Sequence, residues 1–187
     1  MKLSKLLLPI FLCLLIFQGT LIFGQKSEIL FLSGTGADNT VTWEFYCTDG
    51  MNSKEWKTIE VPSCWEQQGF GAYHYGHVPF EDRLKEEGIY KYEFNVPDHW
   101  KDLDVKIVFE GVMTDAAVKI NGKSLGEVHQ GAFYPFEYNI NSVLNYDEIN
   151  LLDVHVKKFS ENMSVNYAER KADYWILSML DSPLIPI

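Results

Sequence analysis

Apolar and polar residues alternate with a period of two in several short segments of this chain. The alternation predicts β-strands at residues 90–96, 105–109, 117–120, 136–140 and 152–156. Between residues 40 and 160, no segment shows the three- and four-residue apolar spacing that is typical of an amphipathic helix. Short strands separated by glycine, asparagine and proline are typical of an antiparallel sandwich. The sequence therefore predicts an all-β fold.

One turn can be predicted from the sequence directly. Asn121-Gly122 follows the strand at residues 117–120, and this dipeptide is the strongest short signal for a two-residue hairpin. We expect residues 125–128 to form the return strand of that hairpin.

Residues 1–24 have the pattern of an export signal. Lys2 and Lys5 precede a long apolar stretch that ends on small and polar residues. The alternative is an uncleaved membrane anchor, because residues 6–23 are about as long as a spanning helix. Pro9 interrupts such a helix and favours a cleaved signal. The sequence therefore predicts export to the periplasm or the extracellular space, with no stable membrane insertion after cleavage.

The charge and the cysteines exclude several classes of function. Acidic residues outnumber basic ones by 26 to 16, and the net charge is −10, which makes nucleic acid an unsuitable partner. Cys13 lies in the leader, and Cys47 and Cys64 form no metal-binding or redox motif. We therefore expect no metal and no cofactor.

Two segments combine aromatic and polar residues. Residues 59–66 indicate a strand that ends at Pro62, and an aromatic, glycine-rich loop follows it. Near the C-terminus, Arg170 and Asp173 lie beside Tyr174-Trp175. Aromatic rings beside a carboxylate suit a sugar, whose C–H groups stack on the rings while its hydroxyls donate to the carboxylate. Packing of the same rings in the sandwich core explains the pattern equally well.

Candidate catalytic residues are less informative. Glycoside hydrolysis needs two carboxylates on either side of the scissile bond. Glu81-Asp82 and Glu86-Glu87 are acidic pairs, which we interpret as a solvated loop. His74 and His77 could ligate a metal with a third donor, but their aromatic surroundings favour a binding or packing role.

A longer series of motifs covers about residues 40–175. In order, these are Trp56 with Val61-Pro62-Ser63-Cys64-Trp65-Glu66, Gly88-Ile89-Tyr90-Lys91-Tyr92-Glu93-Phe94, Val108-Phe109-Glu110-Gly111-Val112, Val118-Lys119-Ile120-Asn121-Gly122, His129-Gln130-Gly131-Ala132-Phe133 and Ala172-Asp173-Tyr174-Trp175. The series resembles the N-terminal sugar-binding domain of glycoside hydrolase family 2, the β-galactosidase, β-glucuronidase and β-mannosidase group. The resemblance implies a jelly-roll β-sandwich of the galactose-binding type over residues 25–175, in a secreted enzyme that degrades polysaccharides.

The resemblance also implies a substrate-binding set. Asp173 matches the family's aspartate that holds substrate hydroxyls. Tyr73-His74-Tyr75 stands where the family often has Tyr-Thr-Asn, so Tyr75 replaces a sugar-contacting asparagine and His74 is its neighbour. The implied ligand is a carbohydrate, with the sugar and the linkage left open. The family's catalytic glutamates lie on a following barrel, so no catalytic role is assigned to any residue of this chain.

The C-terminal residues 176–187 depart from the family pattern, which continues as a Gly-Gly-Ile-Phe-Arg-Pro-Val-like strand. Pro183 and Pro186 would each remove a hydrogen-bond donor from such a strand. We interpret this tail as the product of a truncated or frame-shifted gene, and a genuine short variant is the alternative. Two functions follow: a part of a retaining β-glycosidase, or a stand-alone carbohydrate-binding module without catalysis.

Overall fold

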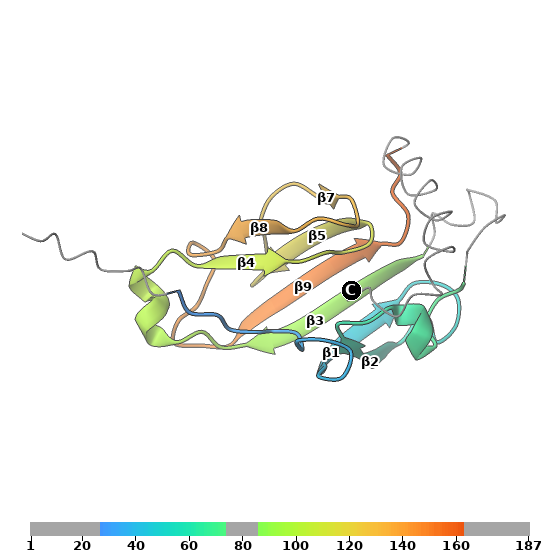
Figure 1. The fold of residues 1–187 in the computed structure, drawn as a ribbon, viewed down its shortest axis with the longest axis horizontal. Helices are drawn as coiled ribbons and strands as arrows, with labels where there is room; N and C mark the ends of the chain where they lie inside the picture. Colours follow the sequence, from blue (N-terminus) through green and yellow to red (C-terminus); the bar gives the residue numbers. More distant parts are fainter. Residues whose placement is uncertain (1–26, 74–85, 163–187) are drawn as a thin grey trace, which may run out of the picture.

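The computed structural model describes residues 27–73 and 86–162, which fold into an antiparallel β-sandwich (Figure 1). Its larger sheet has the strand order β2-β1-β3-β9-β5-β6, with β7 paired to β5, and its smaller sheet pairs β4 with β8. The strands are β1 (Val41–Cys47), β2 (Trp56–Val61), β3 (Glu87–Phe94), β4 (Lys106–Phe109), β5 (Asp115–Ile120), β6 (Lys123–Ser124), β7 (His129–Gln130), β8 (Phe136–Asn139) and β9 (Asn150–Lys157). The all-β prediction is confirmed.

Helical structure within the described ranges is limited to two short 3₁₀ helices, η1 (Trp65–Gln68) and η2 (Asp98–Asp102). No helix there is long and apolar enough to cross a bilayer. The predicted leader at residues 1–24 and the tail at residues 176–187 both lie outside the described residues.

The five predicted strands are present, with different ends. β3 begins three residues before the predicted start, and the predicted strands at residues 117–120 and 152–156 are each extended by two residues at the start. The early start includes Gly88, where an added Cβ would lie 2.4 Å from the Trp65 ring. Because glycine has no side chain, it does not contribute to the alternation of apolar and polar residues, and the alternation therefore does not reveal this part of the strand.

The predicted hairpin turn is confirmed. Asn121 and Gly122 have φ angles of 53° and 76°, the left-handed values that a type I′ turn requires. The return strand β6 covers residues 123–124 and not the predicted 125–128. The chain leaves the sheet at Gly126, where an added Cβ would lie 2.9 Å from the ring of Tyr138.

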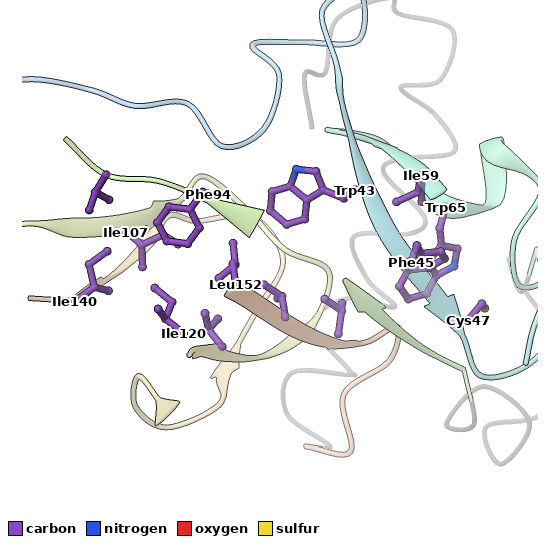
Figure 2. Packing of buried hydrophobic residues seen from close by; sticks show 14 of the residues in the cluster. Trp43, Phe45, Cys47, Ile59, Trp65, Phe94, Ile107, Ile120, Ile140 and Leu152 are labelled. Carbon is purple, nitrogen blue, oxygen red and sulfur yellow. The ribbon is translucent and has the colours of Figure 1, made fainter. Parts of the chain in front are cut away.

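The core has two adjoining parts (Figure 2). Between the sheets, Ile120 and Leu152 of the larger sheet pack with Ile107 of β4 and with Ile140, which directly follows β8. Beside it, Trp43 and Phe45 of β1 are buried with Trp65 of η1 and with Phe70, which follows η1. Burying an apolar side chain of this size stabilises a fold by about 1.5–3 kcal/mol. The second, aromatic part of the core leads directly to the candidate site.

Candidate functional site

The chain after β2 is held in place by Gln68. Its side-chain amide accepts a hydrogen bond from the Glu60 backbone N–H at 3.0 Å and donates to the Glu60 carbonyl at 2.8 Å. Ser63 also donates to that carbonyl. Gly69 then ends η1 with a φ of 86°. These bonds fold the motif at residues 62–69 back against β2 and direct the indole of Trp65 into the core.

Three charged side chains are buried together behind this motif. The ammonium of Lys158 lies 2.5 Å from the Glu66 carboxylate and 3.0 Å from that of Glu86. The three side chains are only 8%, 8% and 2% exposed. A buried charge is tolerated when it is paired and hydrogen-bonded, so each of these groups depends on the others.

Glu86 is the hub of this cluster. Its Oε1 atom accepts a hydrogen bond from the Trp65 indole N–H at 2.8 Å, and its Oε2 atom accepts one from the Ala72 backbone N–H at 3.0 Å. Lys158 donates to the Ala72 carbonyl. Gly71 has a φ of 66°, and an added Cβ would lie 2.1 Å from Glu86 Oε1. Only glycine therefore suits this approach.

The same cluster corrects one prediction. We interpreted Glu86-Glu87 as part of a solvated loop, but Glu86 is buried and ion-paired, and Glu87 begins β3. Glu81-Asp82 lies outside the described residues. Glu66 and Glu86 share one ammonium ion and are closed off from solvent. They are therefore not arranged as a glycosidase acid and nucleophile, which must face the substrate.

Aromatic rings surround the cluster. Phe45 contacts three of these rings. Its ring centroid lies 5.7 Å from that of Trp65, 4.6 Å from that of Tyr90 and 4.9 Å from that of Phe70. Tyr73 is more than half exposed, and its hydroxyl donates to the Glu66 carbonyl at 3.0 Å. The last described residue before position 74 is thus an accessible ring that is fixed by the cluster.

Burial sets the protonation of the neighbouring groups. It raises the pKa of the Tyr90 hydroxyl, and the charge of Glu66 adds to the effect. Burial likewise raises the pKa of the Cys47 and Cys64 thiols. Both cysteines are free and protonated at neutral pH, so neither is an activated nucleophile. In the part of the chain that the structure describes, no group of three or more His, Cys, Asp or Glu side chains could hold a metal.

A second polar group lies where β9 ends. Ser160 and Gln130 donate to Asp115 Oδ2 at 3.0 Å and 3.2 Å, and Asn162 donates to the Gln130 side chain at 2.9 Å. Asp115 is 5% exposed, and its other oxygen, Oδ1, accepts no hydrogen bond from the described residues. These contacts tie Ser160 to β5 directly and Asn162 to β5 through Gln130 of β7.

The two polar groups lie at one end of the larger sheet. In the strand register, Lys157 at the end of β9 is opposite both Glu87 at the start of β3 and Asp115 at the start of β5. The Lys158–Ala72 hydrogen bond joins this end of β9 to the chain just before residue 74. We call this end, defined by Ala72, Glu86, Lys158 and Asp115, the β9-exit end.

The predicted substrate-binding residues Asp173, Tyr75 and His74 lie outside the described residues, as does His77. The structure therefore places none of them. It does place the residues on both sides of positions 74–85 and the residues that precede position 163. Sequence reasoning missed the Lys158–Glu86 pair, because the partners are 72 residues apart and nothing in either local pattern marks them.

Comparison with known proteins gives the family. The profile described as "Glycosyl hydrolases family 2, sugar binding domain" matches residues 34–181, six residues beyond the series of motifs that ends at residue 175. A β-galactosidase from Priestia megaterium is 31% identical over 82% of this chain, and the match covers 16% of that enzyme's length. The chain thus spans about a sixth of the curated relative it matches.

Solved structures share the fold. A β-D-mannosidase from Dictyoglomus thermophilum is 26% identical, with a TM-score of 0.52, and the match covers 71% of this chain and 16% of that one. A β-glucuronidase from Ruminococcus gnavus, solved in complex with D-glucuronic acid, is 18% identical, with a TM-score of 0.52 over 75% of this chain and 24% of that one. The profile match covers most of the sequence, and the chain therefore belongs to glycosyl hydrolase family 2, within the sugar-binding domain of that family.

Proposed function

We propose that this chain is the N-terminal jelly-roll domain of an exported family 2 β-glycosidase, and that it holds substrate hydroxyls at the β9-exit end with Asp173, Tyr75 and His74. The observation that carries the proposal is the Lys158 contact with Ala72 and Glu86. It joins, at one end of the sheet, the residues that precede position 74 and those that precede position 163. All three predicted ligands lie in the stretches of sequence that follow, residues 74–85 and 163–187.

The proposed role is binding and orientation. Exposed rings such as Tyr73 offer a flat apolar surface to the C–H groups of a pyranoside, and a carboxylate accepts hydrogen bonds from its hydroxyls. A hydrogen bond to a charged group contributes about 1.5–3 kcal/mol. The bond-breaking carboxylates of the longer enzyme are proposed, from the resemblance alone, to lie outside the sugar-binding domain.

Titration calorimetry of the chain with galactose, mannose, glucuronic acid and β-linked disaccharides tests the binding role. We expect Asp173→Ala to weaken the affinity for the best of these ligands by about tenfold or more, given the size of one charged hydrogen bond. Asp147→Ala is the matched control, because Asp147 is exposed in the turn before β9, at the other end of that strand. Equal affinities of wild type and Asp173→Ala would contradict the proposal.

Export is a separate part of the proposal. Expression in a Gram-negative host with its own leader should deliver a protein whose first residue is Gln25 to the periplasm or medium. N-terminal sequencing of the exported fraction measures this directly. An intact leader on protein that stays in the membrane fraction would show an anchor instead.

A further inference from the structure

The larger sheet carries two adjacent rows of side chains on the face turned away from the core. In β1, Trp43, Phe45 and Cys47 are buried, so the alternating Glu44 and Tyr46 lie on the opposite face. In the strand register, each of these two residues is directly opposite one residue of β2 and one of β3, which gives two rows of three residues. The apolar row is Trp56, Tyr46 and Ile89, and the polar row is Thr58, Glu44 and Lys91. We call these six residues the outer patch.

Trp56 is the most prominent member of the outer patch. The residue is 46% exposed, although its side chain is one of the largest apolar groups in the chain. Its ring centroid lies 5.5 Å from that of Tyr46, and Lys91 Nζ lies 4.5 Å from it. The indole is therefore held from two sides and still open to solvent. A ring fixed in this way loses little side-chain entropy when a ligand stacks on it.

The polar row supplies hydrogen-bonding groups of both kinds beside the rings. Glu44 accepts, Lys91 donates, and the Thr58 hydroxyl does both. Glu44 and Lys91 are directly opposite in the register, so their charges balance locally although the chain as a whole carries a net charge of −10. The outer patch thus offers an apolar platform with an electrically balanced polar border.

The size and character of this patch favour a sugar over a protein partner. A stable protein interface buries about 800 Å² on each side, with a substantial apolar centre. Three apolar residues next to a row of charged and hydroxyl groups do not supply such a centre. A pyranose ring, with apolar C–H faces and a border of hydroxyls, matches an aromatic platform with a polar border.

We propose that the outer patch is a second glycan-binding site, separate from the β9-exit end, for an uncharged oligosaccharide. One sugar ring stacks on Trp56, and its hydroxyls bind Glu44, Lys91 and Thr58. β2 is an edge strand of its sheet, and no strand of the described residues pairs with its outer side, so the glycan can extend past that edge. The absence of excess positive charge in the patch disfavours uronic acids, which a surplus ammonium would bind.

Nitrogen-15 NMR tests this proposal on the full chain. The chain has five tryptophans, and Trp56→Phe identifies the indole N–H signal of Trp56. We expect cello-, manno-, xylo- or galacto-oligosaccharides to shift that signal in wild type and in Asp173→Ala alike. Trp56→Ala should weaken the affinity measured on the remaining patch signals by about tenfold, the loss expected for one stacking contact. Val108→Ala is the control, because Val108 is exposed on the smaller sheet, and it should change nothing.

Three results of the sugar titrations would overturn the second site, and a fourth can come from the protein without sugar. The first three are the lack of any shift at Trp56 with all four oligosaccharides at millimolar concentration, full affinity in Trp56→Ala, and loss of the Trp56 shift in Asp173→Ala. Concentration-dependent broadening at the patch without sugar would instead assign it to self-association and would also overturn the proposal. If sugar shifts the Trp56 signal and Asp173→Ala binds every ligand with the affinity of wild type, the function proposed for the β9-exit end is contradicted and the outer patch remains supported.

Discussion

The ammonium of Lys158, one residue beyond β9, lies 3.0 Å from the carboxylate of Glu86, one residue before β3. The pair fixes the ends of two neighbouring strands and, through Ala72, the loop that follows η1. The motif at residues 62–69 is thus attached to the sheet by charges and not by apolar packing alone. Predictions about this end of the domain depend on that attachment.

Replacing Lys158 by Met should strongly destabilise the domain. The substitution keeps the approximate length of the side chain but leaves Glu66 and Glu86 buried without a cation, and breaking a buried pair in this way costs about 3–5 kcal/mol. Urea denaturation of wild type and variant measures the loss. Adding Glu66→Gln and Glu86→Gln to Lys158→Met should recover part of it, because no buried charge is then left unpaired. A single variant as stable as wild type would show that the ion pairs are not needed.

Gly71→Ala should also destabilise the domain, for a different reason. A Cβ at this residue meets Glu86 Oε1 at 2.1 Å, and the φ of 66° is unfavourable for any side chain. A strained left-handed residue costs about 1–3 kcal/mol, and displacement of Glu86 adds to that. Gly36→Ala is the control, since nothing lies within 4 Å of an added Cβ there. Equal melting temperatures of the two variants would contradict the close approach of Glu86 to Gly71.

Glu60 should titrate at an unusually low pH. The hydroxyls of Thr40 and Thr42 each donate to its carboxylate at 2.7 Å, and these bonds lower the pKa of Glu60, with Thr40 the larger cause. Because the pKa is lower in the folded state, the contribution of Glu60 to stability is present above its unfolded pKa. It is lost as the pH falls through the folded value. Thr40→Val should move the pKa of Glu60 upward, as carboxyl carbon NMR measures, and an unchanged titration would rule the bonds out.

The purified 187-residue chain should release no nitrophenol from aryl β-glycosides. Among the described residues, the buried carboxylates Glu66 and Glu86 are tied to Lys158, and the resemblance assigns the catalytic glutamates to a following barrel. Enzymatic acceleration is typically about 10⁶-fold or more, and most of it depends on the acid and nucleophile. Linear, enzyme-dependent release that is retained through purification would contradict this prediction.

Much of the fold could be predicted from alternation alone, because strands with one buried face show a period of two. The strand β1 shows the same alternation, with Trp43, Phe45 and Cys47 buried, but was not among our predicted strands. The signal for this strand is therefore present in the local sequence. The beginning of β3 is a different case, since Gly88 fits beneath Trp65 and Phe45 only because it has no side chain. Such a contact is set by residues distant in the sequence.

The site was less predictable than the fold. A carboxylate in a run of charged residues normally faces solvent, and the sequence around Glu86 gives no sign that Lys158 will neutralise it. The outer patch was hidden for a related reason, since Trp56, Tyr46 and Lys91 come from three strands and meet only through the register. The substrate-binding residues came from family resemblance and stay predictions.

Chemical-shift mapping with a β-linked disaccharide tests the central claim most directly. A sugar held at the β9-exit end should shift the backbone signals of Ala72, Tyr73 and residues 158–162, together with that of Asp173, and these shifts should share one saturation curve. The outer patch should respond independently. Saturable shifts confined to the smaller sheet, or no shift at the β9-exit end at millimolar sugar, would contradict the account.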